Sequence, residues 1–198
     1  HDDRDVEIGE ERPGDGADYQ GPDPLARMLR TGQIGTVAVM IPEGLGYAFG
    51  DPAALALIQG VAAVCDETGR GISVYAAANV EAARKALGSA AVDGFIMYCM
   101  EEEPGVLDII RSRGLPVVTV DQPLVAGCRT VTVADRSGAA AAARHLLGLG
   151  HRRFGVLSME LMPDQREGAV SARRIRDSIY AACRERLHGY LEVLAGAG

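Results

Sequence analysis

Short runs of β-branched and aliphatic residues alternate along the chain with longer stretches, many of them Ala-rich, that have helical spacing. Bounded apolar runs predict strands at 34–41, 71–77, 93–98, 115–120, 130–133 and 154–158. Helical periodicity predicts helices at 52–68, 79–89, 104–113, 138–149 and 178–194. Because strands and helices alternate at short intervals, we expect right-handed β–α–β crossovers. The predicted fold class is therefore α/β, a parallel sheet flanked by helices.

The segment from Asp51 to Gly69 carries the clearest helix signals. Asp51 stands where an N-cap is expected, Pro52 follows at the first turn, and Gly69 ends the periodic run. The apolar positions of this segment share one face, and they are Leu55, Ile58, Val61, Ala62 and Cys65. Asn79 opens the next predicted helix as its cap. Both segments are therefore predicted to be helices that pack on the sheet.

Open parallel sheets bind ligands beyond the carboxyl ends of their strands. The candidate site thus lies in the segments that follow Ile41, Tyr98, Val120, Val133 and Ser158. The long polar connection at 159–177 follows the last predicted strand, and such a loop is usually functional or mobile. Neither GxxxxGK[ST] nor GxGxxG follows any predicted strand, and no cofactor is predicted.

The charge of the chain is concentrated at its beginning. Residues 1–23 hold nine of the 27 acidic residues and two of the 20 basic ones, so the remaining 18 of each sign cancel. Acidic, Gly- and Pro-punctuated sequence of this kind buries too little apolar surface to fold, and 1–21 is predicted to be disordered. Domains that bind nucleic acid alone usually carry a basic excess. If the protein works on DNA, most of the DNA-binding part lies outside this chain.

The four cysteines are widely spaced and show no metal-ligand spacing. His145 and His151 lie six residues apart, where ligands on one helix face would lie three or four apart, so no metal site is predicted. Buried cysteines in a reducing compartment are the simplest interpretation. No signal peptide is evident, and no apolar run approaches the ~20 residues that span a bilayer. The expected location is cytoplasmic, without membrane contact.

Several motifs occur along the chain in a characteristic order. They are PDPLARMLRTG at 22–32, VDGFI at 92–96, GLPVV at 114–118, HLLGLGHRR at 145–153 and RLHGY at 186–190. Together they resemble the LacI/GalR family of bacterial transcription regulators, specifically its sensor domain with the periplasmic-binding-protein-like type I fold. Any one motif is weak, whereas the ordered series is specific.

The resemblance implies a domain organisation. Residues 22–32 resemble the family's hinge helix, 33–152 its N-terminal sensor lobe, and 153–198 the start of an incomplete C-terminal lobe. The helix-turn-helix head that precedes the hinge in the family has no counterpart here, so we expect a fragment of such a regulator. The resemblance implies a small-molecule effector, sugar or nucleoside-like, bound between the lobes, operator DNA bound through head and hinge, and a homodimer.

The resemblance also suggests site residues. Arg186, in RLHGY, is the best effector-binding candidate, and the alternative is a surface Arg. Tyr47 and Phe49 follow the first strand, where they either stack on a ligand or pack on the adjacent helix. Asp135 either contacts the effector or, more simply, N-caps the following helix.

The hinge-like segment suggests DNA contacts as well. Leu29 stands where the family places an apolar wedge in the minor groove, and Arg27 and Arg30 would neutralise phosphates. The alternative for Leu29 in this chain alone is a linker residue.

The predicted function is therefore ligand-responsive, repressor-type transcription regulation. One alternative is a solute-binding protein of a sugar transport system, and a less favoured one is a small α/β enzyme. Ser137 and Ser158 lack a paired base in an elbow motif, so catalysis is not expected.

Overall fold

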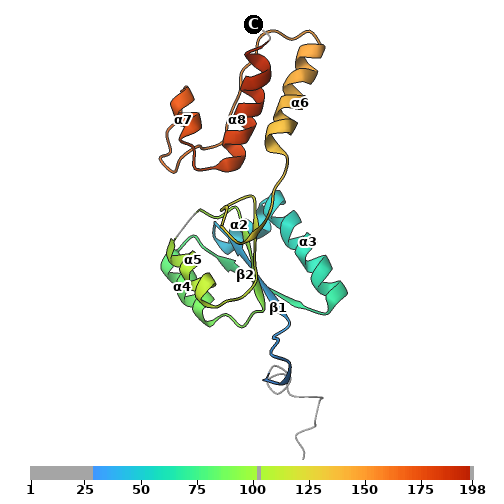
Figure 1. Ribbon diagram of the computed structural model, residues 1–198, viewed down its shortest axis with the longest axis vertical. Coiled ribbons are helices and arrows are strands. Elements are labelled where there is room, and N and C mark those ends of the chain that lie inside the picture. The colour runs from blue at the N-terminus through green and yellow to red at the C-terminus, as the bar shows by residue number, and fades with distance from the viewer. Residues whose placement is uncertain (1–28, 102–103, 197–198) are drawn as a thin grey trace, which may run out of the picture. The chain divides into compact units, whose positions relative to one another are not determined.

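The computed structural model describes residues 29–101 and 104–196. Its contacts divide the chain into two units, His1–Gln33 and Ile34–Gly198. The larger unit contains a five-stranded parallel sheet (Figure 1). The strands are β1 (Thr36–Ile41), β2 (Gly71–Ala76), β3 (Gly94–Tyr98), β4 (Val117–Val120) and β5 (Arg129–Val131). Their order across the sheet is β2-β1-β3-β4-β5, and every adjacent pair is parallel. The predicted fold class is confirmed.

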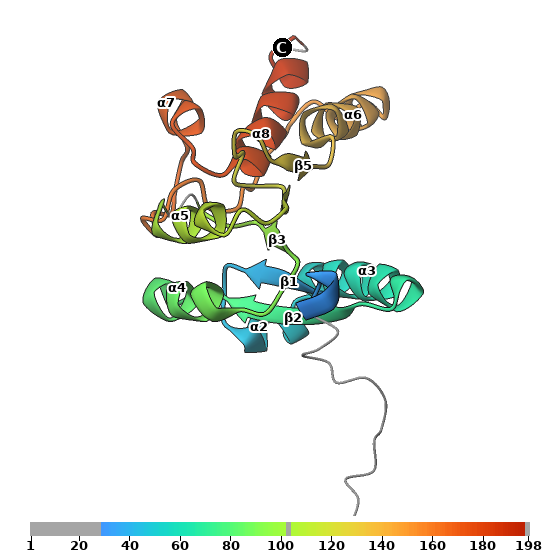
Figure 2. The same ribbon diagram turned by 60° about the horizontal axis from the view of Figure 1, so that its bottom comes forward.

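Helices cover both faces of the sheet. The helices on the sheet are α2 (Leu45–Gly50), α3 (Pro52–Thr68), α4 (Val80–Ser89) and α5 (Pro104–Ser112). The helices α6 (Asp135–Gly148), α7 (Ala172–Arg176) and α8 (Ala181–Leu194) follow β5 and pack on one another. α3 lies on one side of the sheet, and α4 and α5 lie on the other (Figure 1 and Figure 2). Alternation along β1 follows from this arrangement, because successive strand residues point to opposite faces. Ala38 and Met40 join the core under α4 and α5, while Val39 and Ile41 join the core under α2 and α3.

The predicted helix signals operate as expected in α3 and α4. The carboxylate of Asp51 accepts hydrogen bonds from the amides of Ala53 and Ala54, and Gly69 adopts the left-handed conformation with φ of 62°. The side chain of Asn79 accepts from the amide of Ala82. These caps satisfy amides that have no partner within the helix.

Three sequence predictions need correction. Residues 154–158 form no strand, because a strand needs a hydrogen-bonded neighbour and no described strand pairs with them. Leu157 is fully exposed there. Residues 45–50 form a short helix where a loop was expected, and the connection at 159–177 contains α7.

α6 and α8 pack side by side at very short range (Figure 1). α6 presents the small residues Ala139, Ala140 and Ala143, all of them buried, toward its neighbours. Gly189 of α8 lies so close that a Cβ there would overlap the carbonyl oxygen of Arg136. The Arg136 side chain then reaches back to Glu192 at 3.1 Å. Backbone proximity, made possible by small side chains, therefore holds this helix pair together.

We expect Gly189→Ala to lower the free energy of unfolding by about 1–3 kcal/mol, the usual cost of overpacking. Gly138→Ala in α6 is the matched control, since a Cβ there meets nothing within 4 Å. It should raise stability by about 0.5–1 kcal/mol through helix propensity. Urea denaturation of both variants measures the difference, and equal effects would contradict the close-packing account.

Candidate functional site

The strands β3 and β4 are each followed directly by a residue with left-handed backbone. Cys99 has φ of 51° and Asp121 has φ of 64°, a conformation uncommon outside glycine. Hydrogen bonds hold both turns, since the Cys99 amide donates to Val120 and the Asp121 amide donates to Val131. Such strain persists only where the surroundings enforce it, and it is frequent at functional sites. Both residues lie at the carboxyl edge, where the topology predicts a ligand site.

Arg186 and Asp135 form an ion pair at this edge. Asp135 is the first residue of α6, Arg186 lies on α8, and the Arg186 Nε donates to Asp135 Oδ1 at 2.6 Å. The Asp135 side chain is only 10% exposed, while that of Arg186 is 45% exposed. The hydrogen bond to Asp135 raises the pKa of Arg186 further above its ordinary value. Arg186 and Asp135, which were predicted as separate site candidates, are thus bonded directly to each other.

The expectation that Asp135 N-caps α6 is wrong. Ala134 occupies the N-cap position, and no side chain caps the helix there. Asp135 instead lies within the first turn, and its carboxylate turns to Arg186 rather than to amides of its own helix. A carboxylate in the first turn still interacts favourably with the helix dipole.

Asp121 is a second carboxylate beside this pair. Burial raises its pKa most, the negative charge of Asp135 raises it further, and Arg186 partly opposes the increase. Asp121 therefore adds a second negative charge near the Asp135–Arg186 pair. Burial also raises the pKa of the neighbouring Cys99 thiol, with Asp121 adding to the effect, so the thiol is less acidic than usual.

Two tyrosines extend the site along the edge toward α2. Burial raises the pKa of Tyr98 to about 12, with contributions from Cys99 and Tyr47. Burial, followed by the charge of Asp51, also raises the pKa of Tyr47, which is partly exposed on α2. Phe49 lies on the same short helix with most of its side chain in solvent. Tyr47 and Phe49 thus lie on the same short helix, and both side chains are exposed.

Asp135 of the ion pair lines two cavities, and Arg186 also lines a third, of about 150 Å³. The larger has a volume of about 660 Å³ and lies between the end of β4, the start of α6 and α8, with Asp121 and Asp135 in its wall. The smaller, about 280 Å³, is lined by Asp135, Arg186 and Tyr190. Pockets of several hundred Å³ with a few convergent polar groups are typical small-molecule sites. Asp135 borders both cavities.

Further polar contacts connect the start of α8 to the sheet. The Gln122 side chain accepts from the Ala181 amide at 3.2 Å, so a residue after β4 satisfies the first turn of α8. The Tyr180 hydroxyl donates to Glu101 at 2.8 Å. Burial and the hydrogen bond to Glu101 raise the Tyr180 pKa. Glu101 is exposed, and this hydrogen bond connects it to the residue before α8.

Sequence reasoning did not single out Tyr98, Asp121, Gln122 or Tyr180 as site residues. Asp121 had a usable signal, a polar residue directly after a buried strand. Tyr98 and Tyr180 had none, because only the packing of α8 shows which side chains face the strand ends.

Of the hinge candidates, Arg27 lies outside the described residues. Leu29 and Arg30 belong to the last helical residues of the smaller unit, and Leu29 is 82% exposed. Among residues 29–101 and 104–196, no group of three His, Cys, Asp or Glu side chains is placed to hold a metal ion. No helix within the same ranges is long and apolar enough to cross a membrane.

The sequence of the chain is similar to that of known transcriptional regulators. No family model matches the chain. It is 40% identical to an HTH-type transcriptional regulator of Mycobacterium tuberculosis over 91% of the chain and 51% of the relative. It is 37% identical to the HTH-type transcriptional regulator IpsA of Corynebacterium glutamicum, again over 91% and 51%. The chain thus spans about half the length of the curated relatives it matches.

Solved structures agree. A LacI-family transcriptional regulator from Corynebacterium glutamicum superposes with a TM-score of 0.69 and 31% identity, covering 88% of this chain and 53% of that one. The chain is thus similar to LacI-family transcriptional regulators over about half of their length. A complex of the regulator CelR with cellobiose shares the fold at a TM-score of 0.63 and 22% identity, over 90% of this chain and 55% of that one. The LacI-family resemblance drawn from the motifs is confirmed.

The pKa of Asp121 gives a pH prediction. Its pKa in the folded chain is above the ordinary value, so its ionisation destabilises the fold above that pKa and has no effect once pH falls below about 3.9. Asp121→Asn should therefore raise the melting temperature at pH 7, and the gain should shrink steadily toward pH 4. Thermal melts across this range test it, with the exposed Asp108→Asn as control. A gain that is constant with pH would contradict the electrostatic origin.

Proposed function

We propose that this chain is the effector-binding and dimerisation part of a ligand-responsive, repressor-type transcription regulator. The carrying observation is the cluster of Asp121, Asp135 and Arg186 at the carboxyl edge of the sheet, beside a cavity of about 660 Å³. The similarity to HTH-type regulators supports this reading. In this proposal, effector binding changes the affinity for DNA, and no reaction is catalysed. The protein then acts in the cytoplasm.

The chemistry of the cluster favours a neutral, hydroxyl-rich effector, sugar or nucleoside-like. Asp121 and Asp135 accept hydrogen bonds from hydroxyl groups, and Arg186 donates to oxygen atoms. Tyr47 offers an aromatic face at the rim, and Phe49 stays a candidate from the same helix. The larger cavity is lined by four carboxylates and three guanidinium groups (Asp121, Asp135, Glu185, Glu192, Arg136, Arg144 and Arg184), so its wall offers a phosphate group no net positive charge. A bound CelR ligand, cellobiose, is a neutral sugar of this kind.

Coupling to DNA follows from linkage. An effector that binds Arg186 must share it with Asp135, so binding alters how α8 is held against α6. Any such shift that also changes the hinge alters operator affinity, and the two affinities depend on each other reciprocally. Arg27 and Arg30 would contact phosphates and Leu29 would insert in the minor groove.

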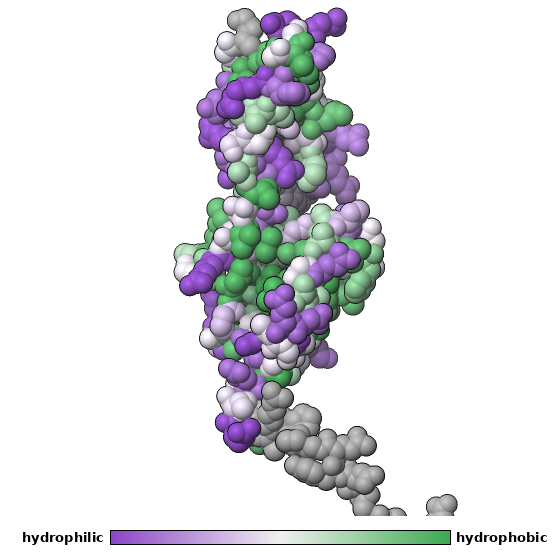
Figure 3. All heavy atoms as spheres, turned by 90° about the vertical axis from the view of Figure 1, so that its right-hand side faces the viewer, coloured by the Kyte–Doolittle hydropathy of each residue, from purple (hydrophilic) through white to green (hydrophobic). Residues whose placement is uncertain are grey.

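We place homodimerisation on the outer face of α3. Val64 of α3 is 58% exposed, whereas Leu57 and Val61 of the same helix pack on the core. Figure 3 faces the side on which α3 lies in Figure 1, and hydrophobic residues are visible there among polar ones.

A solute-binding protein would share this fold, and one structural neighbour, complexed with D-xylulofuranose, is described as periplasmic binding protein/LacI transcriptional regulator. The sequence identity to HTH-type regulators favours a regulator over a solute-binding protein. A small enzyme has no supporting observation.

A thermal-shift screen tests the effector class. Neutral sugars such as cellobiose, simple polyols and nucleosides are compared with their phosphorylated counterparts. A selective ligand at 100 times its Kd stabilises by about 2.7 kcal/mol, which shifts the melting temperature measurably. We expect the shift with a neutral compound and its loss in Arg186→Gln, whereas Arg173→Gln, exposed on α7, retains it. Selective stabilisation by phosphorylated compounds alone would contradict the proposed class.

DNA binding by this chain alone gives a further prediction. Its net charge is −7 and its body is neutral, so it has little counterion release to drive DNA binding. Fluorescence anisotropy with random and promoter DNA at 50 and 200 mM salt should show no specific, salt-sensitive complex. Nanomolar operator affinity of this chain would show that the DNA-binding part is already present.

A further inference from the structure

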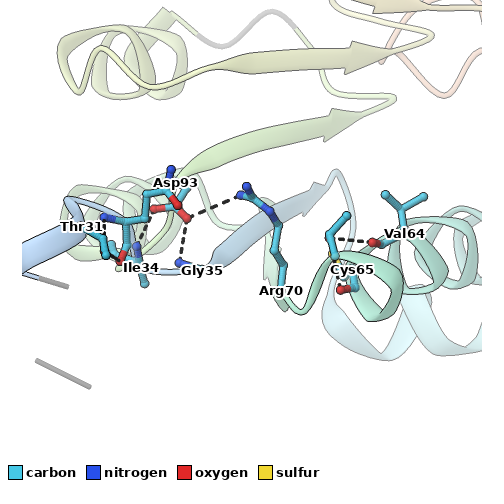
Figure 4. Close-up of polar contacts among 9 residues, drawn as sticks. Thr31, Ile34, Gly35, Val64, Cys65, Arg70 and Asp93 are labelled. Atoms are coloured by element: carbon cyan, nitrogen blue, oxygen red, sulfur yellow. Dashed lines mark hydrogen bonds and ion pairs between the residues drawn. The ribbon is translucent and has the colours of Figure 1, made fainter. Parts of the chain in front are cut away.

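One carboxylate holds the chain where it enters the sheet-containing unit. Asp93 precedes β3, and its two oxygens accept the amides of consecutive residues, Oδ1 from Ile34 and Oδ2 from Gly35, both at 2.7 Å (Figure 4). Arg70 lies 3.8 Å from the same Oδ2. Charge-assisted bonds of this length are about twice as strong as neutral ones. The Asp93 side chain is only 17% exposed, so water competes little for them.

Backbone hydrogen bonds also fix the residues around the Asp93 carboxylate. The Asp93 amide donates to Thr36 at 2.8 Å, and the Gly71 amide donates to Gly35 at 2.7 Å. Gly35 has φ of 82°, a conformation that other residues rarely adopt, so the path into β1 depends on a glycine. Ile34 and Gly35 are therefore fixed before the sheet ladder begins at Thr36.

The position of Asp93 links two regions of the sequence. Ile34 follows directly on Gln33, the last residue of the unit that contains the hinge-like segment. At the opposite end of β3 stand Tyr98 and Cys99, at the candidate effector site. One short strand, in register with β1 and β4, thus carries the effector edge at one end and Asp93 at the other.

We propose that Asp93 is the positioning residue that couples the sensor sheet to the hinge. Through its two hydrogen bonds, a displacement of β3 is transmitted to Ile34 and Gly35 and along the backbone to residues 29–32. This inference rests on the proposed regulatory function for its consequence, but the anchor itself is a property of this chain.

Hydrogen exchange on this chain tests the anchor. Asp93→Asn keeps one acceptor oxygen, and its amide group donates where an acceptor is needed. We expect the protection of the Ile34 and Gly35 amides to fall at least tenfold, while Val39 and Met97 keep theirs. Asp108→Asn, an exposed carboxylate on α5, is the matched control and should change none of these amides.

Two results would overturn the anchor: unchanged protection at Ile34 and Gly35, or an equal loss at Val39 that marks general unfolding. If Asp93→Asn fails to fold, Arg70→Gln replaces it, because it removes only the ion pair. It should accelerate exchange two- to threefold at Ile34 and Gly35 and nowhere else in β1, and no change there would count against the anchor.

DNA affinity of the full-length gene product tests the coupling, using an operator selected in vitro. Asp93→Asn should weaken operator binding about tenfold. Ile110→Val, a buried core substitution in α5 away from residues 34–35, serves as the stability control and should leave affinity unchanged. Equal affinities for wild type and Asp93→Asn, with exchange at Ile34 accelerated, would overturn the coupling. Failure of the wild type to select any DNA would reject the regulatory function, and the exchange result would still decide the anchor.

Discussion

Burial of a parallel sheet on both faces is the constraint on which this molecule depends. With α2 and α3 on one side and α4 and α5 on the other, the buried residues of the strands must be apolar or bonded in pairs, as the hydroxyls of Thr119 and Thr130 are. Polar chemistry is therefore confined to the strand ends. The carboxyl edge carries Asp121 and Asp135, and the amino edge carries Asp93.

The helix pair α6 and α8 supplies the remaining component of the site. Its small-residue contact, centred on Gly189, brings Arg186 within hydrogen-bond distance of Asp135. The hydrogen bond to Asp135 orients the Arg186 guanidinium, and a ligand has to compete with this bond. A ligand that offers oxygen acceptors to Arg186 and hydroxyl donors to Asp135 replaces this contact with equivalent ones.

The two edges of the sheet give the proposed regulation a physical route. β3 is hydrogen-bonded to β1 and β4, so its ends move together rather than independently. Asp93 accepts hydrogen bonds from the two backbone amides before β1, and Cys99, after β3, has the left-handed backbone conformation. Coupling in this arrangement needs no long flexible path, only a strand held at both ends.

The local signals of the chain determined its fold class and most of its elements. Asp51, Asn79 and Gly69 act as expected because capping involves residues only two to four positions apart. The family resemblance, carried by ordered motifs, was equally local. Arg186 and Asp135 were identified as candidates, but not as partners, since 51 residues separate them in sequence. The strand expected at 154–158 failed for the same reason, because a strand forms only beside another strand. What tertiary structure alone decided was which strand ends and helices meet, and with that the charge of the site and the role of Asp93, since contacts between distant residues leave no periodic trace in the sequence.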